Sequence, residues 1–251
     1  LFLIGKKFLN SWGGLTFAML YLLYPATHGI NLVDFHELAF LPLVLFSAIY
    51  YMFMRKTSLF IFFLFCALMI KEDVVLVVIM MTAYAVYYGY YNSPKERWIF
   101  LIFIVASILW LLISFTLIIP HFHPEGYIHS SRYEMSDGLA GLITHNFTLK
   151  VAYLILLFGP LVLTPLAAPE FLLISLPSFA EIVFQDDIAY RINIHYCALL
   201  IPILFTAAIL GTVRIRKTLV EKTPHLVKYL YPLLVIMGIL YAIVWTPAPI
   251  S

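Results

Sequence analysis

The sequence predicts an all-α, polytopic transmembrane helical bundle of about nine spans plus an N-terminal remnant. Of its 251 residues, 63% are hydrophobic and 11% are charged, whereas a soluble domain carries roughly a quarter charged residues. The mean hydropathy is +0.99, and apolar runs alternate with short basic segments along the chain. We therefore expect a multi-pass protein of the cell membrane, with a single transmembrane domain over residues 1–251.

Each span is predicted from an apolar run and the basic residues at its ends. A membrane-spanning helix needs about 20 apolar residues, with a range of roughly 17 to 25. Suitable runs lie at 11–25, 38–54, 58–70, 74–91, 98–120, 149–164, 169–184, 196–213 and 229–245. The chain starts at Leu1 and its first apolar run is very short, so we expect an N-terminally truncated sequence in which Leu1–Ile4 is the tail of an earlier helix.

The basic residues set the expected orientation of these spans. The alternation places eleven of the fifteen Lys and Arg residues on one side of the membrane, which is the cytoplasmic side by the positive-inside rule. Most acids and histidines then lie on the other side, and residues 121–148 form an extracytoplasmic loop. The outer face is therefore the expected working face.

The segment LMIKEDVVLV places Lys71, Glu72 and Asp73 inside an otherwise apolar stretch. Basic pairs before and after it are both expected in the cytoplasm, so two spans must separate them and the three charges form the outer bend of a hairpin. The arm Ser58–Ile70 has thirteen residues, about 20 Å of helix against a hydrocarbon core of roughly 30 Å. The bend should lie below the outer surface, either as a functional cavity or as a local ion pair in a thinned membrane.

A second polar cluster, DFHE, stands just before a predicted span. Asp34 can cap the following helix by accepting its free N–H groups, but capping does not account for His36 and Glu37. Three titratable groups within four residues offer a general base and metal ligands together.

The outer loop and the last outer segment contribute further candidates. In extended chain, His121 and His123 point to one side and could bind a divalent metal such as Zn or Mn; an ordinary polar loop is the alternative. Arg132 and Arg191 join Lys71 as the cations placed to meet an anionic ligand, because a guanidinium donates two parallel hydrogen bonds to phosphate. For Arg191 the alternative is an ion pair within its own loop.

Small residues are expected to serve packing. Gly13 and Gly14 allow close approach of helices, and Cys66 and Cys197 lie in apolar runs without metal-ligand spacing. No block of basic residues suggests a nucleic-acid partner.

Taken together, LLYPATHGINLVDFHE, the hairpin with IKED, LPSF and IHYCALLIP resemble a prokaryotic family of predicted membrane proteins, domain of unknown function 2079 (DUF2079). The resemblance covers most of the chain, and DFHE and KED carry most of its specificity. It implies a GT-C-like fold, that of polytopic glycosyltransferases that use polyprenyl-phosphate-linked sugars. DFHE lacks the Pro expected between His and Glu, and the large acidic outer loop usual in GT-C proteins would precede Leu1.

The resemblance implies transfer of a sugar from a polyprenyl-phosphate donor, a membrane lipid, to an acceptor at the extracytoplasmic face. Asp34 or Asp73 would be the base, with Lys71 and Arg132 on the phosphate, and His36 with Glu72 orienting ligands or binding a divalent metal ion. A transporter, in which intramembrane charges mark a solute path, is the alternative from another class. A non-catalytic membrane scaffold is the third.

Overall fold

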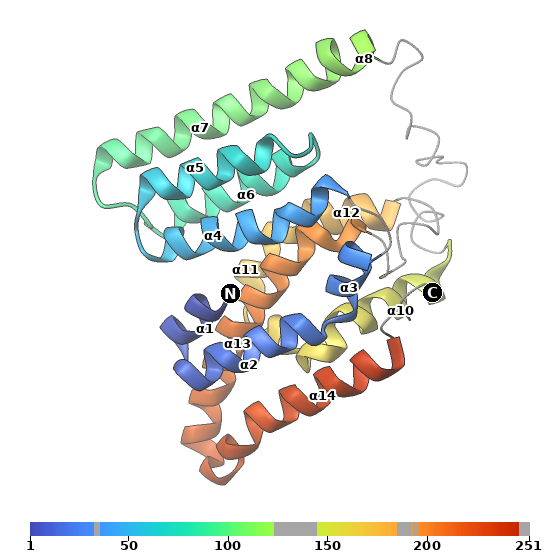
Figure 1. Ribbon diagram of the computed structural model, residues 1–251. Helices are drawn as coiled ribbons and strands as arrows, with labels where there is room; N and C mark the ends of the chain where they lie inside the picture. Colours follow the sequence, from blue (N-terminus) through green and yellow to red (C-terminus); the bar gives the residue numbers. More distant parts are fainter. Residues whose placement is uncertain (33–35, 123–144, 185–191, 193–194, 246–251) are drawn as a thin grey trace. The chain divides into compact units, whose positions relative to one another are not determined.

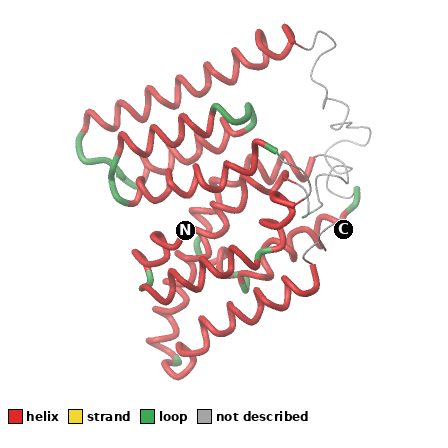
Figure 2. The backbone as a smooth tube through the Cα atoms, in the orientation of Figure 1, coloured by secondary structure: helices red, strands yellow, loops and turns green. Residues whose placement is uncertain are grey.

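The computed structural model describes residues 1–32, 36–122, 145–184, 192 and 195–245, and every regular element in these ranges is helical (Figure 2). The all-α prediction is therefore confirmed for the described part of the chain. The helices group into two compact units. Unit 1 comprises Leu1–Pro42, Thr148–Ser175 and Arg191–Ser251, and unit 2 comprises Leu43–Phe147 and Leu176–Tyr190.

Unit 1 is built around one long helix, α13 (Leu200–Lys222), whose first half is buried. Its elements are α1 (Phe2–Phe8), α2 (Ser11–Leu23), α3 (Pro25–Leu32), η1 (Glu37–Phe40), α10 (Phe147–Phe158), η4 (Gly159–Leu161), η5 (Thr164–Ala167), α11 (Pro169–Leu172), η6 (Leu173–Ser175), η8 (His195–Leu199), α13 (Leu200–Lys222), η9 (Pro224–Tyr229) and α14 (Leu230–Trp245). Helix α13 packs against η5, α1 and α11 (Figure 1). The buried Tyr24 ring meets Phe205 of α13 edge-on at 5.0 Å, and its hydroxyl donates to the Leu157 carbonyl at 2.7 Å.

Unit 2 consists of helices that pack side by side. They are α4 (Leu41–Phe53), α5 (Thr57–Leu68), α6 (Val74–Tyr87), α7 (Pro94–Ile113), the π-helical η2 (Ser114–Ile118), α8 (Ile119–Phe122) and α12 (Leu176–Phe184). Helix α6 packs against α5, α7 and α12. Pro94 opens α7, where the Ser93 N–H donates to the Glu96 carboxylate at 2.8 Å and satisfies one of the free N–H groups of the helix start.

The prediction of nine spans is not met. Three helices in the described residues are long and apolar enough to cross a membrane: Pro94–Phe122, Tyr196–Lys222 and Pro224–Trp245. Five apolar helices are shorter: Ser11–Leu23, Glu37–Phe53, Thr57–Leu68, Val74–Tyr87 and Phe147–Leu161. A 13-residue helix such as α2 is about 20 Å long, less than the hydrocarbon core of roughly 30 Å.

Prolines and local backbone geometry explain the shortening. Pro25 starts α3 directly after α2, with the Tyr24 backbone between them extended. The segment predicted as one span at 169–184 is divided into α11, η6 and α12. Before it, Val162 and Leu163 have left-handed backbone angles, φ 52° and 55°, which end the preceding helix.

The hairpin predicted with its bend at Lys71–Asp73 is confirmed, since α5 and α6 end and begin on either side of these residues and pack on each other. Arg55, before α5, donates to the carbonyls of Gly89 and Tyr91, after α6, at 2.9 and 3.3 Å. The Asn92 side chain donates in turn to the Arg55 carbonyl at 2.8 Å. These bonds join the start of α5 to the end of α6, so the Lys71–Asp73 bend lies at the other end of the helix pair.

An ion pair fixes the Pro-rich turn of unit 1 to α13. Arg214 donates to Glu170 at 3.0 Å and to the Ala167 carbonyl at 2.9 Å. The segments TPLAAPE and RIRK therefore lie at the same end of unit 1. The predicted topology requires this, because it places both in the cytoplasm.

The expected close packing at Gly14 is confirmed. A Cβ at Gly14 would come within 2.7 Å of the Phe2 carbonyl oxygen, a backbone atom that cannot easily move aside. Gly211 of α13 is tighter still, since a Cβ there would overlap the Thr164 carbonyl oxygen. Both cysteines are free thiols, Cys197 fully buried and Cys66 partly so.

Candidate functional site

The bend at residues 69–73 joins α5 to α6 and carries a partly buried ion pair. Asp73 stands at the N-cap position of α6, but its side chain makes no capping hydrogen bond. Instead, its Oδ2 accepts from Lys71 Nζ at 2.6 Å. The Asp73 carboxylate therefore pairs with Lys71 and does not cap the N-terminus of α6.

Burial makes this ion pair unlike an ordinary surface pair. The Lys71 and Asp73 side chains are 19% and 15% exposed. Asp73 Oδ1 is buried and has no hydrogen-bond partner among the described residues. A buried carboxylate oxygen without a partner carries a desolvation cost, and such atoms in native proteins call for an explanation, for example a catalytic role or a ligand.

A fourth charged residue, Glu181, reaches the bend from a distant part of the sequence. It belongs to α12, which packs on α6, and it interacts electrostatically with Lys71, Asp73 and Glu72. Helix α12 has nine residues and is not among the helices able to span a membrane. We call Lys71, Glu72, Asp73 and Glu181 the bend cluster.

The surroundings of Glu181 move its pKa toward neutrality. Burial raises the pKa of this carboxyl, the charge of Asp73 raises it further, and Lys71 opposes the shift only in part; the pKa reaches about 7. A carboxyl group with this pKa can both accept and release a proton near neutral pH, as a general base or a proton carrier must.

Lys71 is held in its charged form. Burial alone lowers the pKa of the ammonium group, but the charge and hydrogen bond of Asp73, with help from Glu181 and Glu72, outweigh burial and raise it. The bend cluster therefore combines a permanent cation with a carboxyl group that titrates near neutrality.

Sequence reasoning missed Glu181. The signal was present, because Glu181 is the one acid in the apolar stretch LPSFAEIVF, and ionisable residues in such stretches are costly and often functional. Its proximity to Lys71 could not be read from the sequence, since about a hundred residues separate them.

The structure brings three of the predicted site residues together, namely Lys71, Glu72 and Asp73. His36 and Glu37 lie in unit 1, where Nδ1 and Oε2 are 3.1 Å apart. His121 lies in α8 of unit 2, edge-on to Phe122. Four predicted site residues lie outside the described residues: Asp34, His123, Arg132 and Arg191.

In the described ranges, no three His, Cys, Asp or Glu side chains are arranged to hold a metal ion. His36 and Glu37 supply two ligand atoms close together, and a complete site needs more. The predicted metal site, with His36, Glu37, His121 and His123 as ligands, stays a prediction.

A family model described as "Predicted membrane protein (DUF2079)" matches residues 1–249. The chain belongs to this family. The resemblance noted from DFHE and KED is thereby confirmed at the level of the DUF2079 family and of a membrane protein. No curated protein and no solved structure matches this DUF2079 chain.

Proposed function

We propose that this DUF2079 chain is a GT-C-like glycosyltransferase of the cell membrane, with several membrane passes. It would move a sugar from a polyprenyl-phosphate donor to an acceptor at the extracytoplasmic face. The bend cluster carries the proposal, because it places a fixed cation, its carboxylate partner and a carboxyl group of near-neutral pKa together.

Glu181 is the proposed general base. It takes the proton of the acceptor's nucleophilic group as that group attacks the sugar's anomeric carbon. The bond from this carbon to the phosphate oxygen breaks, and the polyprenyl phosphate leaves with the electron pair. A base with a pKa near the working pH is the most effective for such a step.

Asp73 and Lys71 have complementary roles in the proposal. Asp73, one of the bases suggested by the sequence, is bonded to Lys71 and holds its ammonium group in place. Lys71 faces the charge that develops on the departing phosphate, which a preorganised cation stabilises. Asp34 remains the alternative base.

The donor phosphate needs more positive charge than the bend cluster supplies. Glu72, Asp73 and Glu181 outnumber the one lysine, and that lysine is already paired. Arg132 and Arg191 are the proposed further cations, suited to phosphate by their paired N–H groups. A divalent metal ion, for which the sequence predicts His36, Glu37, His121 and His123 as ligands, would supply the same stabilisation.

Sugar transfer by the full-length protein tests the proposal directly. Proteoliposomes would receive polyprenyl-phosphate sugars with a radiolabelled sugar, and the rate at which the label passes to the acceptor would be measured. We expect Glu181→Gln to lower the rate by about 10²- to 10⁴-fold, the usual contribution of a general base, and Glu181→Asp to retain part of it. Lys95→Gln, a change at an exposed lysine in the first turn of α7, is the control. Transfer by Glu181→Gln within twofold of wild type would remove Glu181 as the base.

Proton-coupled transport is the second candidate, and the near-neutral pKa of Glu181 favours it. A carboxyl group that binds a proton beside a fixed cation is typical of proton relays in membrane transporters. Proteoliposomes with an internal pH dye distinguish the candidates. Solute-dependent proton uptake that Glu181→Gln abolishes, without any sugar transfer, would favour transport.

A further inference from the structure

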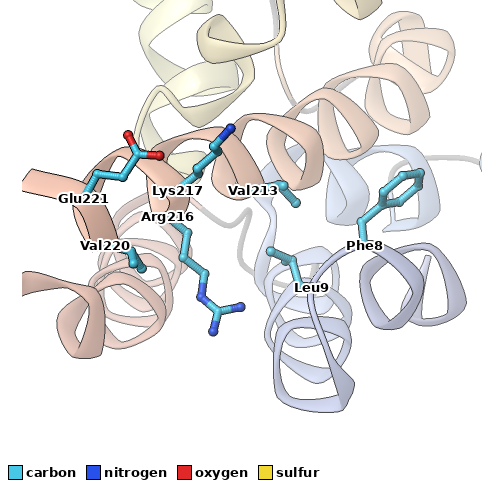
Figure 3. Close-up of a pocket in the computed structure, with 7 residues that line it drawn as sticks. All are labelled: Phe8, Leu9, Val213, Arg216, Lys217, Val220 and Glu221. Atoms are coloured by element: carbon cyan, nitrogen blue, oxygen red, sulfur yellow. The ribbon is translucent and has the colours of Figure 1, made fainter. Parts of the chain in front are cut away.

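A pocket of about 290 Å³ lies in unit 1, between the last turns of α13 and the end of α1 (Figure 3). Phe8 and Leu9 form one wall. The other wall belongs to α13 and includes Val213, Arg216 and Lys217, with Val220 and Glu221 beside them. The pocket thus has an apolar wall and a mixed wall that carries two cations and one carboxylate. Its residues belong to unit 1, whereas those of the bend cluster belong to unit 2.

The two cations of this pocket form no ion pair with the described residues. Among the residues that the structure describes, Arg216 and Lys217 have no salt-bridge partner, whereas their neighbour Arg214 is bound to Glu170. Arg216 is half-buried, and its side chain extends beside Leu9 in Figure 3. Its guanidinium group therefore keeps its N–H donors for a ligand at the apolar wall.

The position along α13 indicates which kind of ligand is available. Tyr196–Lys222 is long and apolar enough to cross a membrane, and the pocket lies at its basic end. Unit 1 also contains three further lysines near these two elements: Lys6 and Lys7 in α1, and Lys222 at the end of α13. The positive-inside rule places this end at the cytoplasmic leaflet, where anionic lipids collect and where basic pockets between helices bind lipid headgroups.

We infer that this pocket binds an anionic diacyl phospholipid of the cytoplasmic leaflet. Arg216 holds the phosphate through charge-assisted hydrogen bonds, and an acyl chain lies against Phe8, Leu9 and Val213. Lys217, whose side chain extends in the opposite direction in Figure 3, adds its positive charge at longer range. The apolar wall favours a lipid over a soluble phosphate, which would leave that wall in water. The inference does not depend on sugar transfer.

Lipid retention by the purified full-length protein tests this inference. The protein would be delipidated in detergent and titrated with phosphatidylglycerol or phosphatidylcholine, and bound lipid would be counted by native mass spectrometry. We expect phosphatidylglycerol to bind more tightly, and Arg216→Gln/Lys217→Gln to weaken it by about tenfold or more, given the usual contribution of basic side chains to anionic lipid binding. Lys56→Gln/Lys95→Gln removes the same charge from exposed positions of unit 2 and should leave binding unchanged.

Two further measurements keep the inference open to refutation. The charge-preserving exchange Arg216→Lys/Lys217→Arg should retain most of the binding, even if the glutamine variant folds poorly. In wild type, soluble glycerol phosphate should not displace the lipid. Equal loss in both glutamine double variants, no preference between the lipids, or ready displacement by glycerol phosphate would each overturn a lipid site at this pocket.

Discussion

Lys71 Nζ and Asp73 Oδ2 lie 2.6 Å apart in the bend between α5 and α6, with both side chains largely withdrawn from solvent. The second carboxylate oxygen of Asp73 is buried without a hydrogen-bond partner in the described part of the chain. Removing the lysine would leave both carboxylate oxygens of Asp73 largely buried without a partner. The stability of the hairpin should therefore depend on keeping both charges or neither.

Lys71→Met should lower the free energy of unfolding by about 2 kcal/mol. This is less than the roughly 3–5 kcal/mol found when a fully buried pair is broken, because both side chains retain some solvent contact. The double variant Lys71→Met/Asp73→Asn should recover at least half of the loss. Unfolding in detergent, analysed as a double-mutant cycle, measures the coupling. A double variant as unstable as the sum of the single variants would rule out this pairing energy.

Stability should depend on pH through Glu181. Its pKa is about 7 in the folded chain against an ordinary 4.5, so the folded state holds this proton more tightly than the unfolded state. The resulting stabilisation is complete below about pH 4.5 and is lost as the pH rises through 7, with a total of roughly 3 kcal/mol. The melting temperature in detergent should fall with rising pH for wild type, and it should change less for Glu181→Gln. Identical slopes would contradict the burial of this carboxyl group.

Gly211→Ala should destabilise unit 1 by about 2–3 kcal/mol, because the new methyl group overlaps the Thr164 carbonyl and overpacking forces backbone shifts. Gly238→Ala is the matched comparison, since its Cβ would meet the flexible end of Leu20 at 2.5 Å. That side chain can rotate away, so we expect a smaller cost. Thermal unfolding of both variants gives the comparison, and an equal or larger loss at Gly238 would contradict the assigned packing.

The orientation of the α5–α6 hairpin can be tested by thiol labelling. Met69 of the bend is 71% exposed, and Lys95, in the first turn of α7, is also exposed. In a Cys66→Ser/Cys197→Ala background, a membrane-impermeant maleimide should label Met69→Cys from outside the cell. Lys95→Cys should react only after the membrane is opened. Labelling of both positions from the same side would contradict the hairpin topology.

Local sequence patterns were sufficient for the helical class and the hairpin. Placing charges or unpaired backbone groups in lipid is costly, so each membrane segment is apolar, helical and bounded by basic residues. Each segment satisfies these requirements largely by itself, and its local sequence therefore shows them. The positions of Arg55 and Lys95 therefore predicted the bend at Lys71–Asp73. The same reasoning overestimated helix length, because the local backbone at Tyr24, Val162 and Leu163 ends helices inside apolar runs.

The sequence by itself determined that this chain is an α-helical membrane protein of the DUF2079 family and that charges gather at residues 71–73. Only the tertiary structure decided that Lys71 takes Asp73 as its partner and that Glu181 comes close to both. The physical reason is that charge pairing inside a low-dielectric interior depends on distance in space. The packing of α12 on α6 sets that distance, and no local pattern records it.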